Sequence, residues 1–497
     1  MPRPGGRGTF GPHLPGDGAR GHAGGTPVGP AGDRPVSRVD LVIVGAGPAG
    51  LAAAIEARGL GLDTLVIDEQ PAPGGQVWRA IERRARAGEA VALGAAYAAG
   101  AAVVARFRAS GAAYRPGARV WQIESGGRVF VSAEGRSEVV EAGAVLLATG
   151  AQERPVPFPG WLLPGVLTVG AAQILLKTSW QVPEGPVWIA GSGPLVALYA
   201  VQVLRAGGHL AGILDTTPPG LLRRAAGQAG AALRGVADLL AGLGWLARLR
   251  LAGVRIVPGV REFAAEGDDR LCGLRYRTAA GGAVRREPAA VLLVHEGVVP
   301  AIHPTLLLGC DHDWDAAQGS FRPRLGALGE TSRPGIFVAG DLGGIGGATA
   351  ALARGRLAAI GIAARAGRLD EAAARRRAAP VRAGLGRALA VRPLLDALYP
   401  PPARPLADDT VVCRCEGLTA GAIRAAARIG RPGPNQVKAF TRCGMGPCQG
   451  RQCGLTLSAL LAETQGATMA EIGSFRVRPP LAPISLDELA ALADMGE

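Results

Sequence analysis

The stretch VDLVIVGAGPAGLAAAIEARG, residues 39–59, decides the expected fold of this chain. Its apolar run Leu41–Val44 predicts a buried parallel strand, and the residues after the glycines predict a helix. Gly45, Gly47 and Gly50 form a G-x-G-x-x-G pattern, in the strand-to-helix setting that this pattern requires. The stretch therefore predicts a dinucleotide-binding unit.

Each residue of this turn has an expected role. Gly45 permits the tight turn, Gly47 lets the backbone approach a pyrophosphate, and Gly50 lets the helix pack closely on the strand. Pro48 and Ala49 lie in the first turn of the helix, where free N–H groups and the positive dipole end favour phosphates. A glycine-rich turn without a ligand is the alternative, and the combined pattern favours the ligand.

An acidic residue follows at the end of the next predicted strand, TLVID. Asp68 lies close to the 20-residue offset at which such units hold ribose hydroxyls, and Glu69 is the alternative. Strand and helix patterns continue to alternate along the chain, which predicts an α/β fold with doubly wound parallel sheets.

A second strand–glycine–helix unit begins at GPVWIAGSGPLVALYAVQVLRAGG, residues 185–208. Gly191 and Gly193 match the glycine pattern, but Val196 stands at the third glycine position. Asp215 ends the following strand, where it could meet a ribose. Three outcomes stay open for this domain: it binds NAD(P), it binds another nucleotide, or it keeps the fold without a ligand.

Five of the seven cysteines crowd into a short piece near the C-terminus. Thiolates are soft ligands, so this cluster predicts an iron–sulfur centre, with structural zinc as the alternative. Five thiols for four places leave one spare, and Cys443 is the expected spare. The expected metal ligands are Cys413, Cys415, Cys448 and Cys453.

Composition excludes several classes of function. The formal charge of +14 is nearly all arginine spread along the 497 residues, and no basic stripe interleaved with aromatic residues indicates a nucleic-acid partner. No cysteine precedes Cys272, so the dithiol of a disulfide reductase is missing. No apolar run predicts a transmembrane segment and no secretory signal opens the chain, so a cytoplasmic location is expected.

Three later pieces bear on the choice between FAD and NAD at the first site: PGGQ, LLATG and PGIFVAGD. Together with VGAGPAG they resemble the two-dinucleotide-domain flavoproteins related to thioredoxin reductase and glutathione reductase. The resemblance implies FAD in the first domain, with Asp341 holding its ribityl and phosphate region; the alternative for this residue is a helix cap. The other residues implied in these pieces are Gly75, Gln76, Thr149, Gly150 and Gly340.

The cysteine module also resembles a known unit. CRCE, residues 413–416, with GMGPCQGRQC resembles the bacterioferritin-associated-ferredoxin-like [2Fe–2S] module, which also closes anaerobic glycerol-3-phosphate dehydrogenases. The resemblance implies a [2Fe–2S] cluster. The last two cysteines have four residues between them here and two in the small ferredoxin, which leaves the ligand set open.

The expected organisation is two Rossmann-like dinucleotide-binding domains followed by a small [2Fe–2S] domain. The boundaries are a disordered extension at 1–38, a discontinuous FAD-binding domain at 39–155 and 291–370, a second, NAD-type domain at 156–290, a helical linker at 371–408, the [2Fe–2S] domain at 409–465 and a tail at 466–497.

Several segments together resemble one family: DEQPAPGGQVWR, PFPGWLLPGVLTVGAAQILLK, HEGVVP and RCGMGPCQGRQCG. This family contains the HcnB-type (B) chain of hydrogen cyanide synthase, the A subunits of octopine and nopaline opine oxidases, and the equivalent subunit of D-hydroxyproline dehydrogenase. The resemblance covers residues 39–497. It implies an FAD-dependent oxidoreductase subunit of a hetero-oligomer that acts on CH–NH or CH–NH₂ donors.

Membership implies a division of labour. A glycine/D-amino-acid-oxidase-like flavoprotein subunit would oxidise the amine, opine or imino acid, and this chain would relay the electrons through FAD and its cluster to an acceptor. Some relatives carry FMN at a subunit interface, and some have a small ferredoxin-like third subunit. Peripheral attachment to a membrane through the complex is an alternative to a free cytoplasmic state.

Two other functions stay open. One is a self-sufficient NAD(P)H-dependent oxidoreductase that uses the second nucleotide site, and the other is a scaffold with vestigial cofactor sites. The sequence offers no convincing acid/base or nucleophile set: His295, Glu296 and His312 are candidates, but a histidine beside a strand is more often structural. The substrate, the acceptor and the subunit stoichiometry are not readable from the sequence.

Overall fold

The computed structural model describes residues 9–10, 37–278, 282–402 and 405–492. Most of the expected disordered extension at 1–38 lies outside these residues. Within it, Thr9–Phe10 forms the short strand β1, which pairs in parallel with β10 (Val182–Pro183).

The first domain is built on a seven-stranded sheet with the order β4-β3-β2-β7-β6-β5, in which β21 also pairs with β7. The strands β4, β3, β2, β7 and β21 run parallel, whereas β5 and β6 are antiparallel additions. Their bounds are β2 (Ser37–Val44), β3 (Thr64–Asp68), β4 (Ala113–Pro116), β5 (Arg119–Ile123), β6 (Arg128–Ala133), β7 (Arg136–Leu147) and β21 (Ile336–Val338).

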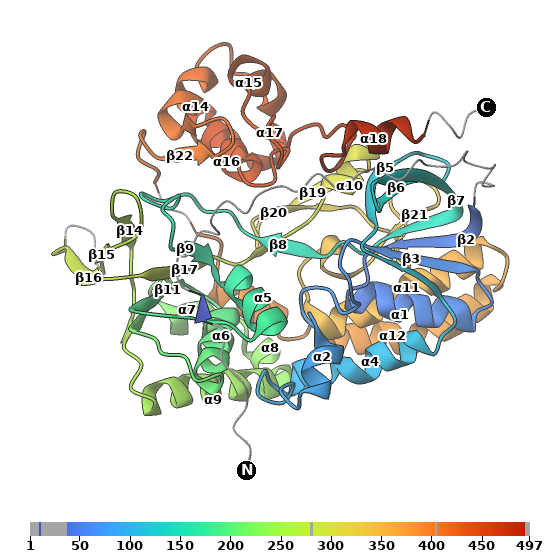
Figure 1. Cartoon of the computed structure of the whole chain (residues 1–497), viewed down its shortest axis with the longest axis horizontal. Coiled ribbons are helices and arrows are strands. Elements are labelled where there is room, and N and C mark those ends of the chain that lie inside the picture. The colour runs from blue at the N-terminus through green and yellow to red at the C-terminus, as the bar shows by residue number, and fades with distance from the viewer. Residues whose placement is uncertain (1–8, 11–36, 279–281, 403–404, 493–497) are drawn as a thin grey trace, which may run out of the picture.

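Two helices cover one face of this sheet and touch each other closely. Helix α1 (Pro48–Gly59) follows the glycine turn, and α11 (Gly347–Arg365) follows β21 (Figure 1). The helices approach so closely that a Cβ atom on Gly355 of α11 would lie 2.1 Å from the Ala49 carbonyl oxygen of α1. This contact brings the C-terminal part of the discontinuous domain onto its N-terminal part.

The second domain has a five-stranded, fully parallel sheet with the order β13-β12-β11-β17-β9. Helices α5 (Val169–Ser179), α6 (Pro194–Arg205) and α9 (Val236–Leu251) belong to this domain, and a three-stranded antiparallel sheet, β14-β15-β16, flanks it. The bounds are β9 (Val166–Thr168), β11 (Val187–Gly191), β12 (Gly212–Asp215), β13 (Ile256–Val257), β14 (Glu262–Glu266), β15 (Gly273–Arg277), β16 (Arg285–Pro288) and β17 (Val291–His295). The α/β fold with two Rossmann-like units is therefore confirmed.

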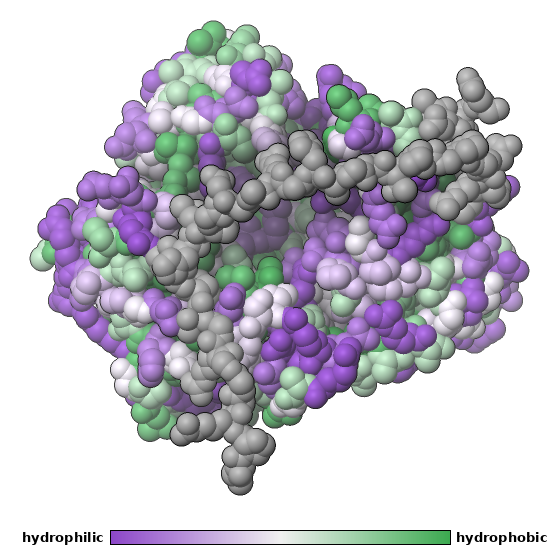
Figure 2. All heavy atoms as spheres, viewed as in Figure 1, coloured by the Kyte–Doolittle hydropathy of each residue, from purple (hydrophilic) through white to green (hydrophobic). Residues whose placement is uncertain are grey.

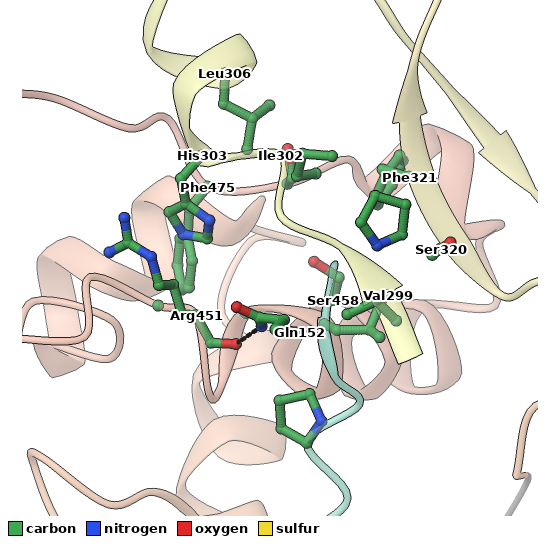
Figure 3. A pocket seen from close by; sticks show the side chains of 16 residues that line it. Gln152, Val299, Ile302, His303, Leu306, Ser320, Phe321, Arg451, Ser458 and Phe475 are labelled. Carbon is green, nitrogen blue, oxygen red and sulfur yellow. Dashed lines mark hydrogen bonds between the residues drawn. The ribbon is translucent and has the colours of Figure 1, made fainter. Parts of the chain in front are cut away.

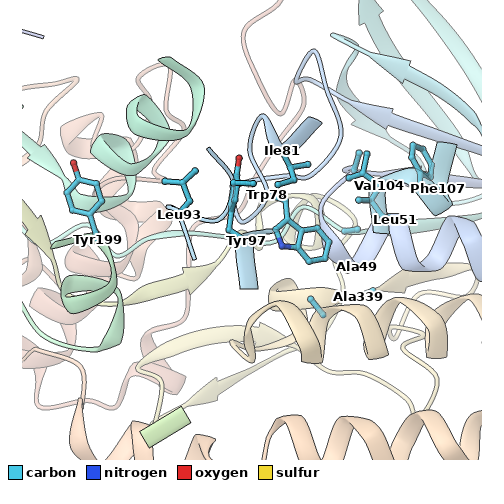
Figure 4. Packing of buried hydrophobic residues seen from close by; sticks show 14 of the residues in the cluster. Ala49, Leu51, Trp78, Ile81, Leu93, Tyr97, Val104, Phe107, Tyr199 and Ala339 are labelled. Atoms are coloured by element: carbon cyan, nitrogen blue, oxygen red, sulfur yellow. The ribbon is translucent and has the colours of Figure 1, made fainter. Parts of the chain in front are cut away.

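One continuous apolar core joins the two domains. It runs from α1 and α4 (Gly100–Arg108) of the first domain to α6 of the second. Figure 4 shows Leu93 and Tyr97 between the residues around Trp78 on one side and Tyr199 of α6 on the other. The side chain of Tyr199 is completely buried, so separating the domains would expose large apolar surfaces to water.

The C-terminal part consists of a linker, a compact module and a returning tail. Helices α12 (Glu371–Ala388) and α13 (Arg392–Leu398) form the linker, and the module has its own core around Val437 and Leu457. The tail then crosses back to the first domain, where α18 (Leu486–Ala490) lies beside β7 (Figure 1). The module comprises β22 (Val411–Cys413), β23 (Leu418–Thr419), α14 (Ala420–Ala427), α15 (Pro434–Thr441), α16 (Gly454–Gln465) and α17 (Met469–Ile472).

Helix α9 presents an apolar face to solvent. Leu240 and Leu243 are 62% and 61% exposed, and Val236 and Leu251 at the two ends of the helix are also exposed. Figure 2 shows green, apolar atoms at this lower edge of the molecule. Among the described residues, no helix has both the length and the apolar character needed to cross a membrane.

We expect Gly355→Ala to destabilise the first domain by about 1–3 kcal/mol, because the added methyl group must push α11 away from α1. Gly386→Ala is the matched control in α12, where an added Cβ meets no atom within 4 Å. There the better helix propensity of alanine should leave stability unchanged or raise it by up to about 1 kcal/mol. Thermal unfolding of both variants checks this, and an unshifted melting temperature for Gly355→Ala would contradict it.

Candidate functional site

The first glycine turn is built from two glycines that the fold requires and one that it does not. A Cβ on Gly45, which has φ +106°, would lie 2.6 Å from the Ala148 carbonyl oxygen, and a Cβ on Gly50 would lie 1.9 Å from the Gly45 oxygen. A Cβ on Gly47 would meet only the Gly75 Cα atom, at 3.8 Å. Packing therefore does not explain Gly47, and the open space beside its backbone suits the close approach of a ligand.

The acid predicted from the sequence holds this turn in place. The Asp68 Oδ2 atom accepts a hydrogen bond from the Ala46 N–H group at 2.5 Å, and Oδ1 accepts one from Gln70 N–H at 2.7 Å. Burial raises the pKa of the Asp68 carboxyl group, and these two hydrogen bonds oppose the shift. Glu69, the alternative, lies on the surface just after the strand.

Two further predicted segments meet at the same turn. Gly75 comes so close that a Cβ on it would lie 2.7 Å from the Gly47 Cα atom. Gly340, at the end of β21, has φ +75°, and a Cβ there would lie 2.9 Å from the Ala49 side chain. The structure thus brings four predicted segments together: the glycine turn, the Asp68 strand end, the PGGQ loop and the β21 end.

Asp341 shows the capping role that was its alternative. Its Oδ1 atom accepts hydrogen bonds from the N–H groups of Gly346 and Gly347, at 2.9 and 3.0 Å, at the entry to α11. A capping carboxylate and a ligand-holding carboxylate are compatible, since one oxygen atom makes both helix bonds. Thr149 hydrogen bonds at 3.4 Å to the Ala301 carbonyl oxygen, and Gly150 has φ +71°.

Two buried cations beside this site were not predicted. Arg79 is 9% exposed, and its charge lies near the carboxylates of Asp68 and Glu69. Lys177, on α5 of the second domain, donates hydrogen bonds to the Gln76 carbonyl oxygen at 3.0 Å and to the Gln173 side chain at 2.8 Å. Lys177 is one of only two lysines in an arginine-rich chain, which was the available signal.

Burial lowers the pKa of Lys177 to about 7, and the nearby charge of Arg79 adds to the shift. An unprotonated amine at this position still satisfies the Gln76 carbonyl oxygen, because it keeps two N–H groups. The pair therefore ties the PGGQ loop to the second domain without requiring a fixed buried charge.

The second nucleotide turn differs from the first. A Cβ on Gly191 would lie 2.0 Å from the His295 carbonyl oxygen. The His295 ring is buried, and its Nδ1 atom lies 2.7 Å from the Glu153 carboxylate, which also accepts a hydrogen bond from Gly170 N–H at 2.8 Å. This pairing gives His295 a structural role at the β17 end.

The five clustered cysteines form a buried triad and a more exposed pair. The sulfur atoms of Cys413, Cys443 and Cys453 all lie within 4.8 Å of one another, and all three residues are buried. The sulfur atoms of Cys415 and Cys448 are 3.9 Å apart. Cys443, the expected spare, thus lies inside the triad and is not set apart from the other thiols.

The backbone around these thiols is arranged to favour negative sulfur. Burial raises the pKa of the Cys413 thiol, and hydrogen bonds from the Gly444 and Glu416 backbone oppose the shift. Gly446 is required here, because a Cβ on it would lie 2.2 Å from the Cys415 Cβ atom. The donor set is therefore soft, compact and partly supplied with backbone N–H donors, which suits an iron–sulfur cluster or zinc.

The module docks onto the first domain around a small apolar cavity of about 70 Å³ (Figure 3). Gln152 donates a hydrogen bond to the Arg451 carbonyl oxygen at 2.9 Å, and the His303 ring lies 3.2 Å from the Gln449 carbonyl oxygen. Burial, with a contribution from the Arg451 charge, lowers the pKa of His303 to about 4, so the ring is neutral at pH 7. Arg451 itself lies near both Cys448 and Glu69, so one cation faces the thiols and the first nucleotide site.

Lys177 makes the stability of the protein depend on pH. Its folded pKa of about 7 lies below the ordinary value of 10.5, so between these values the unfolded chain binds a proton that the folded chain lacks. Stability therefore rises with pH across this window. From pH 7 to about pH 9.5, the unfolding free energy of the wild type should rise by about 3 kcal/mol relative to Lys177→Met. Lys438→Met, at a less buried site, is the control, and parallel curves for wild type and Lys177→Met would contradict the assignment.

Comparison with known proteins agrees with this geometry. A family model described as pyridine nucleotide-disulphide oxidoreductase matches residues 39–355, and one described as the sarcosine oxidase A3 domain matches residues 408–493. The second match spans both the cysteine module and the tail. The solved structure of L-proline dehydrogenase from P. horikoshii covers 92% of this chain and 81% of its own, with a TM-score of 0.66 and 19% identity, which shows a shared fold.

Curated relatives match along nearly the whole chain. The opine oxidase A subunit of Rhizobium meliloti (strain 1021) is 44% identical over 92% of this chain and 99% of its own length. The HcnB subunit of hydrogen cyanide synthase of Pseudomonas protegens is 33% identical over 89% of this chain and 96% of its own. The chain therefore belongs to the family of FAD-dependent oxidoreductase subunits that contains the opine oxidase A subunit and the HcnB subunit of hydrogen cyanide synthase, as the sequence predicted.

Proposed function

We propose that this chain is the electron-transfer flavoprotein subunit of a hetero-oligomeric amine, opine or imino-acid dehydrogenase. A partner subunit of the glycine- and D-amino-acid-oxidase type oxidises the substrate, and this chain passes the electrons to an acceptor. One observation carries the proposal: a dinucleotide cradle and a five-thiol module are packed against each other within one chain. The absence of any cysteine before Cys272 separates it from the disulfide reductases that share the fold.

The residues of the first domain fit FAD. Gly47 leaves its backbone open to a pyrophosphate, Asp68 stands at the strand end where a ribose is held, and Asp341 starts the helix that faces the cradle. When bound there, FAD supplies a centre that takes electrons in pairs and gives them up singly. The chain's own contribution is to orient the cofactor and to keep water away from it.

The residues of the module fit a [2Fe–2S] cluster. Three ligands are Cys413, Cys448 and Cys453, and the fourth is Cys415 or Cys443. When bound there, the cluster supplies a one-electron carrier. Arg451 and the backbone donors around Cys413 favour the negative charge that such a site accumulates.

An assembled state is supported by the apolar face of α9. Leucines that are three-fifths exposed, in a row along one helix, are unusual on a protein that works alone. Relatives in this family are named as subunits of opine oxidase and of hydrogen cyanide synthase. The proposed partner therefore has a surface to account for.

Replacing single cysteines tests the proposed cluster. Cys413→Ser and Cys453→Ser, prepared without oxygen, should lose most of their iron and acid-labile sulfide and the matching visible absorption, because serine is a poor ligand for this cluster. Cys272→Ser, at an exposed and isolated cysteine, should keep both. Iron-free wild-type protein from the same preparation would overturn the cluster, and the contents of Cys415→Ser and Cys443→Ser assign the fourth ligand.

Reconstitution tests the division of labour. The purified chain alone should not reduce a dye with opines, imino acids or glycine as donors, because its described residues offer no acid/base set facing an open substrate site. Addition of the oxidase-like protein encoded beside it should restore turnover in a stable complex. Substrate oxidation by the isolated chain at the rate of the complex would refute the proposal.

A further inference from the structure

The two glycine turns of this protein have different backbones, although their sequences are alike. Gly47, which precedes α1, has φ −77° and ψ −177°, an extended conformation open to any residue. Gly193, which precedes α6 at the equivalent position, has φ +96° and ψ 171°. The second turn therefore does not present its N–H groups in the arrangement of the first.

The space in front of the second turn also has a different occupant. A Cβ on Gly193 would point toward the ring of Tyr399, 4.0 Å from its Cγ atom. Burial raises the pKa of the Tyr399 phenol, and the carboxylate of Asp215 adds to the shift. Tyr399 thus lies between the glycine turn and the acid at the end of β12, the two groups that hold pyrophosphate and ribose in a dinucleotide site.

Packing on both sides fixes the linker that carries this tyrosine. Upstream, Leu394 and Leu398 of α13 share a buried cluster with Ala231 of α8 (Ala229–Arg234), and a Cβ on Gly235 would lie 2.4 Å from the Val391 side chain. Downstream, a Cβ on Gly319 would lie 2.5 Å from the ring of Pro401. Tyr399 is therefore held in the crevice by contacts that do not involve the turn itself.

The helix after the second turn carries a further difference. The third glycine of the pattern is replaced by Val196, whose side chain is buried. In the first turn the equivalent Gly50 has no room for a Cβ, since that atom would lie 1.9 Å from the Gly45 oxygen. The start of α6 must therefore stand further from its turn than the start of α1 does.

We propose that Tyr399 closes the second nucleotide crevice, so that the FAD-loaded protein has no site for NAD(P)H. Tyr399 acts as a specificity-determining residue: it excludes the pyrophosphate and ribose of a dinucleotide by occupying their place. This inference goes beyond the proposed relay function, because closure of the crevice would stand even if the relay were wrong. With the crevice closed, electrons can enter this chain only from a protein or an organic donor.

Titration of the FAD-loaded chain with NADH tests the closure. Wild type and Tyr399→Phe, which keeps the ring, should show no saturable binding up to about 1 mM by calorimetry. Tyr399→Ala removes the ring while leaving Gly191, Gly193 and Asp215 in place, and it should bind NADH at least about tenfold more tightly than wild type. The FAD and iron contents of the three proteins should be equal, which separates this result from failure of the proposed function.

Two outcomes would overturn the proposal. Wild type that binds NADH as tightly as Tyr399→Ala would show that the crevice is open. A folded Tyr399→Ala protein that gains no binding would show that Tyr399 is not what closes it. Tyr399→Leu, which keeps an apolar contact with the α13 cluster, replaces Tyr399→Ala if the latter does not fold, with the same expectation.

Discussion

The close approach of backbone to backbone around α1 is the constraint on which the rest of this structure depends. Gly50 lets α1 sit against its own turn, and Gly355 lets α11 cross α1 almost in atomic contact with Ala49. Gly340 then brings the end of β21 to the same point. Segments some 300 residues apart in sequence converge here because no side chain keeps them apart, and the nucleotide cradle is the result.

The cysteine module depends on that convergence in turn. It reaches the first domain through two carbonyl oxygens, those of Arg451 and Gln449, which are held by Gln152 and His303. Gln152 lies on β8 (Ala151–Glu153), directly after the LLATG segment that ends beside the glycine turn. A shift of α1 or β7 would therefore be transmitted to the position of the thiols. The tail completes the attachment, since Arg451 also donates a hydrogen bond to the Leu481 carbonyl oxygen at 2.8 Å.

The sequence predicted those parts of the site that depend on local backbone geometry. The glycines of the first turn, the acid at the end of TLVID and the crowding of five thiols follow from rules of spacing, and the structure brings them together. The sequence did not predict Lys177 and Arg451, because each makes its contacts with residues far away in the chain. The grouping of Cys443 with Cys413 and Cys453 was missed for the same reason: even five-residue steps say nothing of how the chain folds back.

The second domain shows most clearly what a motif leaves undetermined. A G-x-G pattern states what the backbone permits, but it does not state which residue the rest of the chain places in front of it. Here α13 packs on the second domain and carries Tyr399 to the mouth of the turn, while nothing comparable lies before Gly47 among the described residues. The linker must cross this mouth to bring the module from the end of α11 to the far side of the cradle (Figure 1). A chain that carries its thiols on such a linker thereby loses the open crevice, so one route of electron entry is given up in exchange for a fixed position of the other centre.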